Sequence, residues 1–353
     1  MPSKIVHRIE RELGMAGLAE ALAHKLPASD LRSLLLEVYQ VRADATKEPA
    51  GLAQAGRDAL VKPSSVSARD FAAFDLAAFE AAEHFEALDL SPVCPFGVSS
   101  KLGSTHQNNL LTTIRNVEGL GDSTIAMALE AAHRRSSGEV IRLCASHRVI
   151  RLQPFEGPGL TPHFRLFAMV TAGRDSGSWN FELEQLADHL RVYLRMFRML
   201  EAAGFSIRGP LVEVSDMDAV EAALHTAGVD HEEVRRNIRA HWFGGSDRFL
   251  QEHGIDLARD AEHPLLEKAV LQPLRAEFPE AELRVNQARL EGLGYYRGFA
   301  LRISPLAPDG NRYPVADGGF TDWTARLLGN RKERLLISGI GSEFLCKKYR
   351  LSE

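Results

Sequence analysis

The chain has 353 residues, of which 45% are hydrophobic and 25% charged, values that are ordinary for a globular protein. Its formal net charge of −5 gives no global electrostatic reason to bind nucleic acid or an anionic membrane. The absence of a run of 18 apolar residues argues against a transmembrane helix, and the charged start MPSKIVHRIERELG argues against a secretory signal. These features predict a cytoplasmic protein of two domains, or of one large domain with an insertion.

The cysteines are odd in number and widely spaced, at Cys94, Cys144 and Cys346. Such usage fits a reducing compartment. The histidines have no ligand spacing with Cys144, and His241 stands alone, so no metal site is expected. Cys94 and Cys144 are expected to be buried thiols rather than nucleophiles.

Residues 1–62 are predicted to form a helical N-terminal segment, because apolar residues recur at helical spacing, as at Ile9 and Leu13. Residues 61–70 indicate a linker. The stretch 68–90 is predicted to be one amphipathic helix, with four phenylalanines along it.

From 138 to 173 two β-rich stretches flank a Gly/Pro loop, which predicts an antiparallel hairpin. A strong helix is expected at 180–205, ending at Gly204. Residues 211–285 read as a strand followed by four helices, at about 216–227, 230–240, 245–253 and 263–277. The remaining chain predicts strands at 283–289, 296–304, 312–317 and 334–340, a helix at 321–328, and the start of a helix after Gly341.

Several segments, in this order, are similar to those of one enzyme class: FEALDLSPVCPFG, VIRLQ, PHFRLFAMVTAG, LEGLGYYRGFALRI, ADGGFTDW and LISGIGSEFL. The chain resembles the catalytic core of class II aminoacyl-tRNA synthetases over about 68–345. Within that class it is most similar to histidyl-tRNA synthetase and to the regulatory subunit of ATP phosphoribosyltransferase. The resemblance implies an α+β fold, an antiparallel sheet flanked by helices. It places the core at 68–353, with a mixed insertion at about 206–285.

The resemblance also implies a ligand site. Arg151 matches the arginine that holds the α-phosphate of ATP in the family, and the paired tyrosines match the amino-acid pocket. Strand alternation would turn only one of the two rings into that pocket. Taken alone, the tyrosines would be ordinary strand aromatics. The residues assigned to the site are Arg151, Gln153, Arg165, Met169, Gly173, Glu291, Tyr295, Tyr296, Asp317, Gly318 and Gly319.

Some of these residues depart from the family's pattern. Gln153 replaces a glutamate, while Glu291 and Phe344 replace arginines, and a phosphate needs fixed cations or donors. Met169 and Gly173 replace polar residues that grip histidine. Adenylate formation by the histidyl route is therefore not expected. The stretch after the third motif is too short for an anticodon-binding domain, so tRNA charging is not expected either.

Two functions stay open. The first is a non-charging paralogue that binds an amino acid or related metabolite, with a regulatory role on a partner such as an ATP phosphoribosyltransferase catalytic chain. The second is an ATP-dependent, carboxylate-activating ligase, for which Arg151, Arg165 and Arg174 would supply the cations. Only the second would use ATP with Mg²⁺; otherwise no cofactor is named. Both predict a homodimer through residues 70–97, because the phenylalanine face of that helix would be partly uncovered in a monomer.

Overall fold

The computed structural model describes residues 4–103, 105–135, 138–153, 161–230, 233–234, 236, 238 and 245–351. The chain divides into two compact units. One comprises Met1–Lys62 and Thr112–Val117, and the other comprises Pro63–Leu111 and Glu118–Glu353. His241, part of the loop that follows Arg151, and part of the helix expected at 230–240 lie outside the described residues.

The N-terminal unit is made of short helices, as the apolar spacing predicts. None of its four helices contains a buried residue. Ile5 and Leu13 of the first helix are more than half exposed. The helices are α1 (Lys4–Leu13), α2 (Leu18–His24), α3 (Ala28–Asp44) and α4 (Glu48–Arg57).

The larger unit is built on an eight-stranded sheet in the order β1-β4-β5-β10-β9-β8-β6-β7. Its neighbours are antiparallel except for the pairs β1–β4 and β6–β7, which are parallel. The sheet is thus mixed rather than wholly antiparallel as expected. Its strands are β1 (Glu86–Ala87), β4 (Ile141–Ile150), β5 (His163–Arg174), β6 (Arg208–Asp216), β7 (Glu282–Val285), β8 (Arg297–Leu306), β9 (Ala316–Thr321) and β10 (Glu333–Ile340). A separate two-stranded sheet pairs β2 (Val93–Pro95) with β3 (Val117–Gly119).

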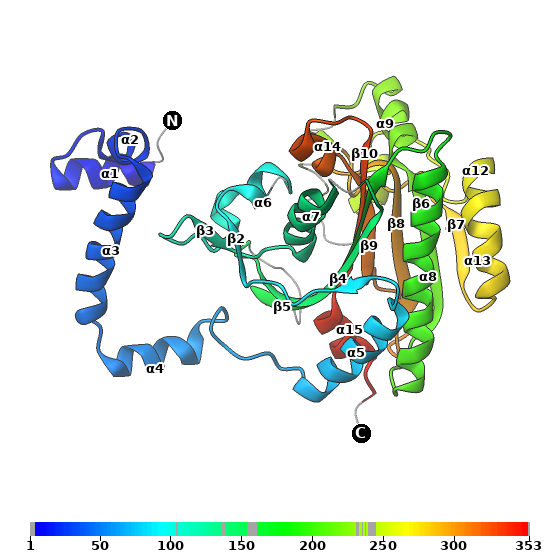
Figure 1. Ribbon diagram of the computed structural model, residues 1–353, viewed down its shortest axis with the longest axis horizontal. Helices are drawn as coiled ribbons and strands as arrows, with labels where there is room; N and C mark the ends of the chain where they lie inside the picture. Colours follow the sequence, from blue (N-terminus) through cyan, green and yellow to red (C-terminus); the bar gives the residue numbers. More distant parts are fainter. Residues whose placement is uncertain are drawn as a thin grey trace. The chain divides into compact units, whose positions relative to one another are not determined.

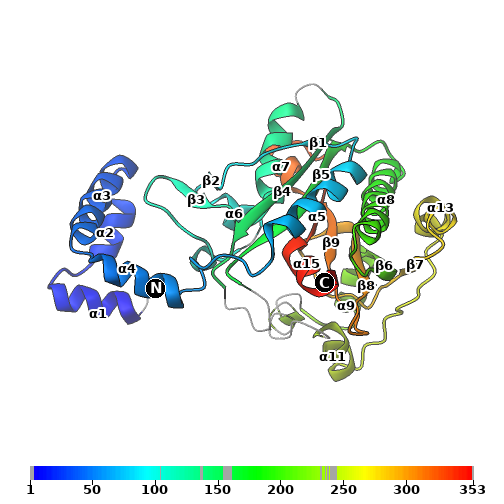
Figure 2. The ribbon, with the colours of Figure 1, turned by 90° about the horizontal axis from the view of Figure 1, so that it is seen from below.

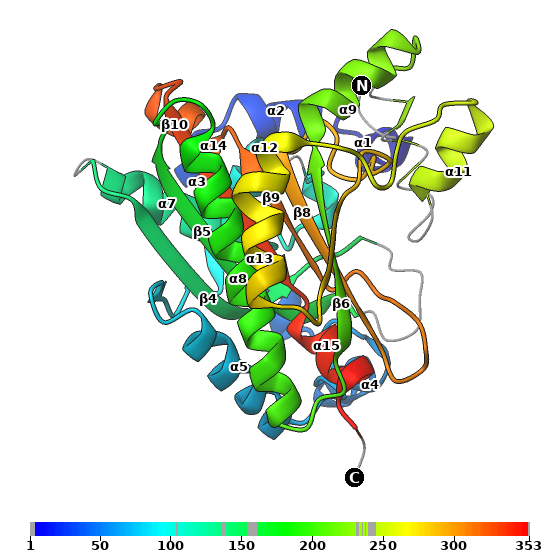
Figure 3. The same ribbon diagram turned by 90° about the vertical axis from the view of Figure 1, so that its right-hand side faces the viewer.

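Helices cover both faces of the large sheet. Residues of α5 and α8 share one apolar cluster, and residues of α7 belong to another on the opposite face (Figures 1 and 3). Figure 2 shows α15 beside α5. The helices are α5 (Ala68–Ala81), α6 (Val98–Lys101), η1 (Gln107–Asn109), α7 (Ser123–Arg134), α8 (Asn180–Ala202), α9 (Met217–Thr226), α11 (Gly245–Glu252), α12 (Pro264–Leu266), η3 (Glu267–Leu271), α13 (Gln272–Glu277), α14 (Trp323–Leu328) and α15 (Ser342–Tyr349).

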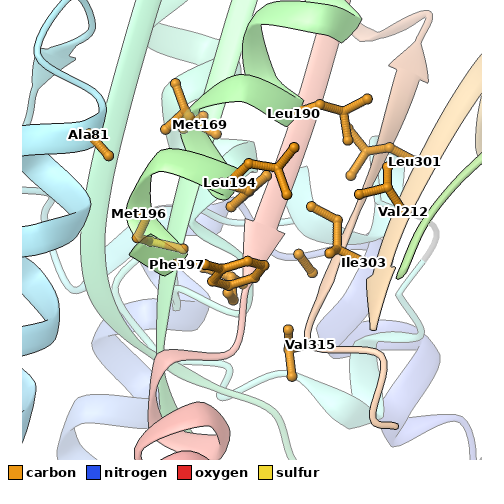
Figure 4. Close-up of a cluster of buried hydrophobic side chains, with 14 of the residues drawn as sticks. Ala81, Met169, Leu190, Leu194, Met196, Phe197, Val212, Leu301, Ile303 and Val315 are labelled. Carbon is orange, nitrogen blue, oxygen red and sulfur yellow. The ribbon is translucent and has the colours of Figure 1, made fainter. Parts of the chain in front are cut away.

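The long helix α8 forms the centre of the first cluster. Leu190, Leu194 and Phe197 are buried on its sheet-facing side, where they meet strand residues such as Leu301 (Figure 4). Gly204 follows the helix with a φ of +87°, the left-handed conformation that glycine adopts readily. The helix and its end are as the sequence predicts.

The helix α5 ends at Ala81, earlier than the expected residue 90, because the chain turns into β1. Phe71, Phe74 and Phe85 are buried in the cluster that α5 shares with α8. These three side chains are therefore covered within the chain, whereas Phe79 is only partly buried, so the phenylalanine face is left partly uncovered only at Phe79.

All three cysteines are buried and unpaired. Burial raises the pKa of the Cys144 thiol to about 12. The expectation that Cys94 and Cys144 are buried thiols is confirmed. Within the described ranges, none of the helices combines the length and the apolar character that crossing a membrane requires.

Candidate functional site

Arg151 lies just after β4 and is held by the start of α7. Its Nε donates to the carbonyl oxygen of Gly121 at 2.7 Å, and its Nη2 lies 3.2 Å from Asp122 Oδ2. The other oxygen of Asp122 accepts from the backbone N–H of Thr124 and so caps α7. One carboxylate therefore both caps a helix and neutralises the arginine.

A small cavity joins this ion pair to the tyrosine box. Its volume is about 20 Å³, which is room for about one water molecule. Its walls mix polar and apolar groups: Ser99, Gly103, Thr105, Leu110, Gly121, Asp122, Ile125, Arg151 and Tyr295. The structure thus brings Arg151 and Tyr295 together, and adds Asp122 to them.

The two tyrosines lie in the turn before β8 rather than in the strand. Their rings are 4.9 Å apart and inclined at 75°, and the Tyr295 ring also meets Trp323 at 5.8 Å. Strand alternation therefore does not apply to them, and the expected position of the pair in the strand was wrong. Tyr295 borders the cavity, and Tyr296 is buried.

The glycines of the ADGG segment have neighbours from the chain itself. A Cβ added to Gly319 would lie 2.6 Å from the Tyr296 ring, and one added to Gly318 would lie 2.5 Å from Ser338 Cβ. Real Cβ atoms do not approach so closely, so the missing side chain of Gly319 makes room for Tyr296. Neither glycine borders the small cavity.

Ion pairs fill the space around Tyr296. Arg289 is buried; it forms an ion pair with Asp317 and donates to the carbonyl oxygens of Leu301 and Glu291. The hydroxyl of Tyr296 donates to the second carboxylate oxygen of Asp317 at 3.3 Å. The side chain of Asp317 is thus held from two sides.

Glu291 replaces an arginine of the family's pattern and has its own cation. Its carboxylate accepts from Arg302 Nη2 at 3.1 Å. Burial acts to raise the pKa of Glu291, but Arg302, Ser246 and Arg289 outweigh that effect, and the pKa is lowered. Glu291 therefore stays ionised, and its negative charge is compensated within the chain.

The other expected site residues lie elsewhere. Arg165 pairs with Asp75 of α5 at 2.8 Å, and its guanidinium lies 5.2 Å from the Phe71 ring centre. Met169 is buried in the cluster under α8 (Figure 4), and a Cβ on Gly173 would lie 2.2 Å from the Phe181 ring. These residues are on the α5–α8 side of the sheet, whereas Tyr296 belongs to the cluster on the opposite side.

The third motif carries no cation at Phe344. That ring packs against the α8-side cluster and meets Tyr313 at 5.5 Å. The neighbouring Glu343 is buried and accepts from Arg148 at 3.0 Å. Gln153 is half-buried, and the residues that follow it, 154–160, lie outside the described part.

Sequence reasoning missed Asp122 and Arg289. Asp122 carries a recognisable signal, because an aspartate before Ser-Thr at the start of an apolar period is typical of a helix cap. Arg289 carries none, since its partner Asp317 is 28 residues away in sequence. Among the residues that the structure describes, no group of three or more His, Cys, Asp or Glu side chains is placed to hold a metal ion.

No protein-family model and no curated protein matches the sequence. Solved structures do match the fold. A histidine–tRNA ligase subunit from Alicyclobacillus acidocaldarius superposes with a TM-score of 0.59 at 16% identity, over 81% of this chain and 94% of that one. The core of the chain has the histidyl-tRNA synthetase fold.

Two further structures support this class II synthetase fold. An ATP phosphoribosyltransferase regulatory subunit/histidyl-tRNA synthetase from Bacillus halodurans has a TM-score of 0.57 at 13% identity, over 81% of this chain and 82% of that one. A histidyl-tRNA synthetase from a Nostoc species has a TM-score of 0.56 at 13% identity, over 82% and 74%. The expected resemblance to the synthetase core is confirmed at the level of the fold.

Proposed function

We propose that the chain is a non-charging paralogue of histidyl-tRNA synthetase that binds a small ligand, an amino acid or a related metabolite, beside Arg151 and Tyr295. One observation carries the proposal: the arginines that would have to hold ATP are already paired with carboxylates of the chain. Arg151 pairs with Asp122, Arg165 with Asp75, and Arg174 with Glu333.

This pairing weakens the case for a triphosphate. ATP would have to displace a carboxylate from each arginine, and Phe344 supplies no charge in compensation. A charge-assisted hydrogen bond contributes about 1.5–3 kcal/mol, so the loss of even one should weaken ATP binding about tenfold or more.

The same group of residues suits a zwitterion. The ligand's α-carboxylate can pair with Arg151 in place of Asp122, and its α-ammonium can pair with Asp122 in place of Arg151. Both side chains would then keep an oppositely charged partner. Because the cavity holds about one water molecule, the pair must separate to admit the ligand. Tyr295 would then border the ligand's side chain.

Calorimetry with ATP tests the non-charging part of the proposal. The expected result is no ATP binding that depends on Arg151, together with no histidine-dependent exchange of pyrophosphate into ATP. Tight ATP binding that disappears in Arg151→Ala would overturn the proposal and favour the ATP-dependent ligase.

Thermal denaturation with a panel of amino acids tests the ligand part. A ligand at 100 times its Kd stabilises the native state by about 2.7 kcal/mol, so a specific binder raises the melting temperature. The rise should vanish in Arg151→Ala and persist in Arg69→Ala, which removes an exposed arginine of α5. A panel without any binder, or a rise unaffected by Arg151→Ala, would contradict the proposed site.

A regulatory role on a partner enzyme, such as an ATP phosphoribosyltransferase catalytic chain, is part of the same proposal. The fold that the chain shares with the ATP phosphoribosyltransferase regulatory subunit/histidyl-tRNA synthetase from Bacillus halodurans supports this role. Co-purification with such an enzyme, and a change in its rate on addition of this chain, are the expected results. Unchanged kinetics at saturating concentrations would remove the regulatory part.

A further inference from the structure

The N-terminal unit leaves much of its apolar surface uncovered. None of its four helices contains a buried residue. Of the large apolar side chains that are exposed within the described residues, more than half lie before residue 62. A monomeric globular protein rarely leaves so many apolar side chains clustered in the open, so this unit is expected to have a partner.

The helix α3 carries the most regular of these surfaces. Its apolar side chains recur at alternating intervals of three and four residues, at Leu31, Leu34, Val38 and Val41. That spacing is the heptad pattern of a coiled coil, with Leu31 and Val38 at the a positions and the other two at the d positions. Leu34 and Val38 are each 45% exposed and Val41 is 62% exposed, whereas Leu31 is half-buried. This stripe therefore has the spacing that packs against a second helix.

The charges beside the stripe select the partner and its direction. All the g positions of this heptad within α3 are acidic: Asp30, Glu37 and Asp44. An antiparallel copy would bring these carboxylates face to face, because g positions then meet g positions. In a parallel copy, a g position meets the e position five residues further on, so Glu37 faces Arg42 of the partner subunit. The charges thus favour a parallel copy of the same helix.

Glu37 and Arg42 are both free to make this contact. Each is exposed, and within the part of the chain that the structure describes neither has a side-chain partner. Asp44, by contrast, accepts from Gln40 Nε2 at 2.9 Å. One helix thus carries both halves of a complementary ion pair that a single chain does not form. A second copy supplies everything that the stripe and its charges require.

We propose that α3 pairs in parallel with α3 of a second copy of this chain. The apolar stripe forms the seam, and Glu37 pairs across it with Arg42 of the partner subunit. The helix has 17 residues and is about 25 Å long, which is only about two heptads. Such a short pair is weak by itself, so it strengthens a dimer rather than holding one at micromolar concentration. The proposal does not depend on the ligand proposed for the Arg151 cavity.

Oxidative crosslinking of the full chain tests the pairing, because all three native cysteines are buried. Val41→Cys puts a thiol at a d position, where parallel copies bring the same residue together, and a mild oxidant should give a disulfide-linked dimer. Ser33→Cys is the matched control: it is exposed on the same helix, lies off the stripe and hardly changes the side chain's size. It should stay monomeric. In an antiparallel pair that sets Leu31 against Val41, the two introduced thiols would lie about 15 Å apart.

Charge reversal tests the ion pair. Glu37→Arg and Arg42→Glu each place like charges across the seam, so each should slow the crosslinking of Val41→Cys about fivefold at low salt. The double variant restores opposite charges and should recover the rate. Recovery separates a specific pair from a general loss of helix, since all these variants keep helix-forming residues.

Three results would overturn the proposal. The first is a Val41→Cys chain that crosslinks no faster than Ser33→Cys, and the second is a double variant as slow as the single ones. The third is a disulfide that forms only when Leu31→Cys and Val41→Cys chains are mixed, which would make the pair antiparallel. A Val41→Cys thiol that neither crosslinks nor reacts with a maleimide would mean that the chain's own larger unit covers the stripe.

Discussion

A buried histidine shows how single residues shape the core. His189 of α8 is wholly buried; its ring nitrogens lie 2.9 Å from Thr171 Oγ1 and 2.8 Å from Ser338 Oγ, and Ser338 also accepts from Tyr193. A serine beside a histidine suggests a nucleophile, but this pair lies inside the core. Its role is to satisfy polar groups between α8 and two strands.

The same histidine predicts a pH dependence of stability. Burial, which penalises the charged ring, lowers the pKa of His189 to about 3. In the unfolded chain the value is about 6.5, so between pH 6.5 and 3 only the unfolded state gains this proton. The free energy of unfolding should therefore be unaffected by His189 above pH 6.5. Below that pH it should fall by up to about 1.4 kcal/mol per unit.

Urea unfolding at several pH values checks this expectation, with His189→Asn as the comparison. His147, whose pKa is also lowered by burial, contributes in the same direction, so the difference between the two proteins isolates His189. Equal slopes for the two proteins between pH 6 and 4 would contradict the prediction.

At the scale of elements, α8 should be the most sensitive to truncation of its side chains. Leu190 is fully buried between α8 and the sheet (Figure 4). Leu190→Ala should lower the free energy of unfolding by about 2–5 kcal/mol, since it removes a buried side chain and leaves a cavity. Leu76→Ala is the matched control, because Leu76 of α5 is 70% exposed. A loss below 1 kcal/mol for Leu190→Ala, or similar losses for both, would show that α8 packs differently.

Helices and hairpins that depend on residues close together in the chain were predictable from the sequence. The pairing of strands that are distant in the chain was not. The hairpin β4–β5 and the helix α8 follow from periodicity and turn residues close in the chain. The parallel pair β6–β7 depends on Leu211 meeting Glu282, a contact that no local pattern encodes. Met169 was assigned to the site by resemblance, but in a strand the face changes at every residue. Its neighbours Ala168 and Val170 face the side that holds Tyr296.

On the scale of the whole molecule, the two apolar clusters draw all their residues from the larger unit. Their members, and the partly buried residues packed against them, begin at Val66. A chain lacking residues 1–62 should therefore fold and melt within about 2 °C of the full chain, which corresponds to less than about 1 kcal/mol. Calorimetric melting of both chains checks this. Aggregation of the shorter chain, or a much lower melting temperature, would show that the N-terminal unit supports the core.

The homodimer remains a prediction, but its interface is now expected to involve residues other than the buried phenylalanines of α5. Within 70–97 the large apolar side chains that stay exposed are Leu76, Val93 and Phe96. If this surface is the interface, light scattering will give a dimer at micromolar concentration, and Phe96→Glu will give a monomer. A wild-type chain that is already monomeric would remove the prediction.

Asp122 connects the occupancy of the small cavity with the capping of α7. Because one of its oxygens caps α7 and the other holds Arg151, an occupant that takes Arg151 and offers its ammonium to Asp122 exchanges the charged neighbour of the capping carboxylate. Occupancy of the cavity and fraying of the first turn of α7 are then thermodynamically coupled, and the coupling is reciprocal. A change in hydrogen exchange at the Thr124 amide on addition of ligand would report this coupling. In that way α7 would transmit the occupancy of the cavity to the sheet.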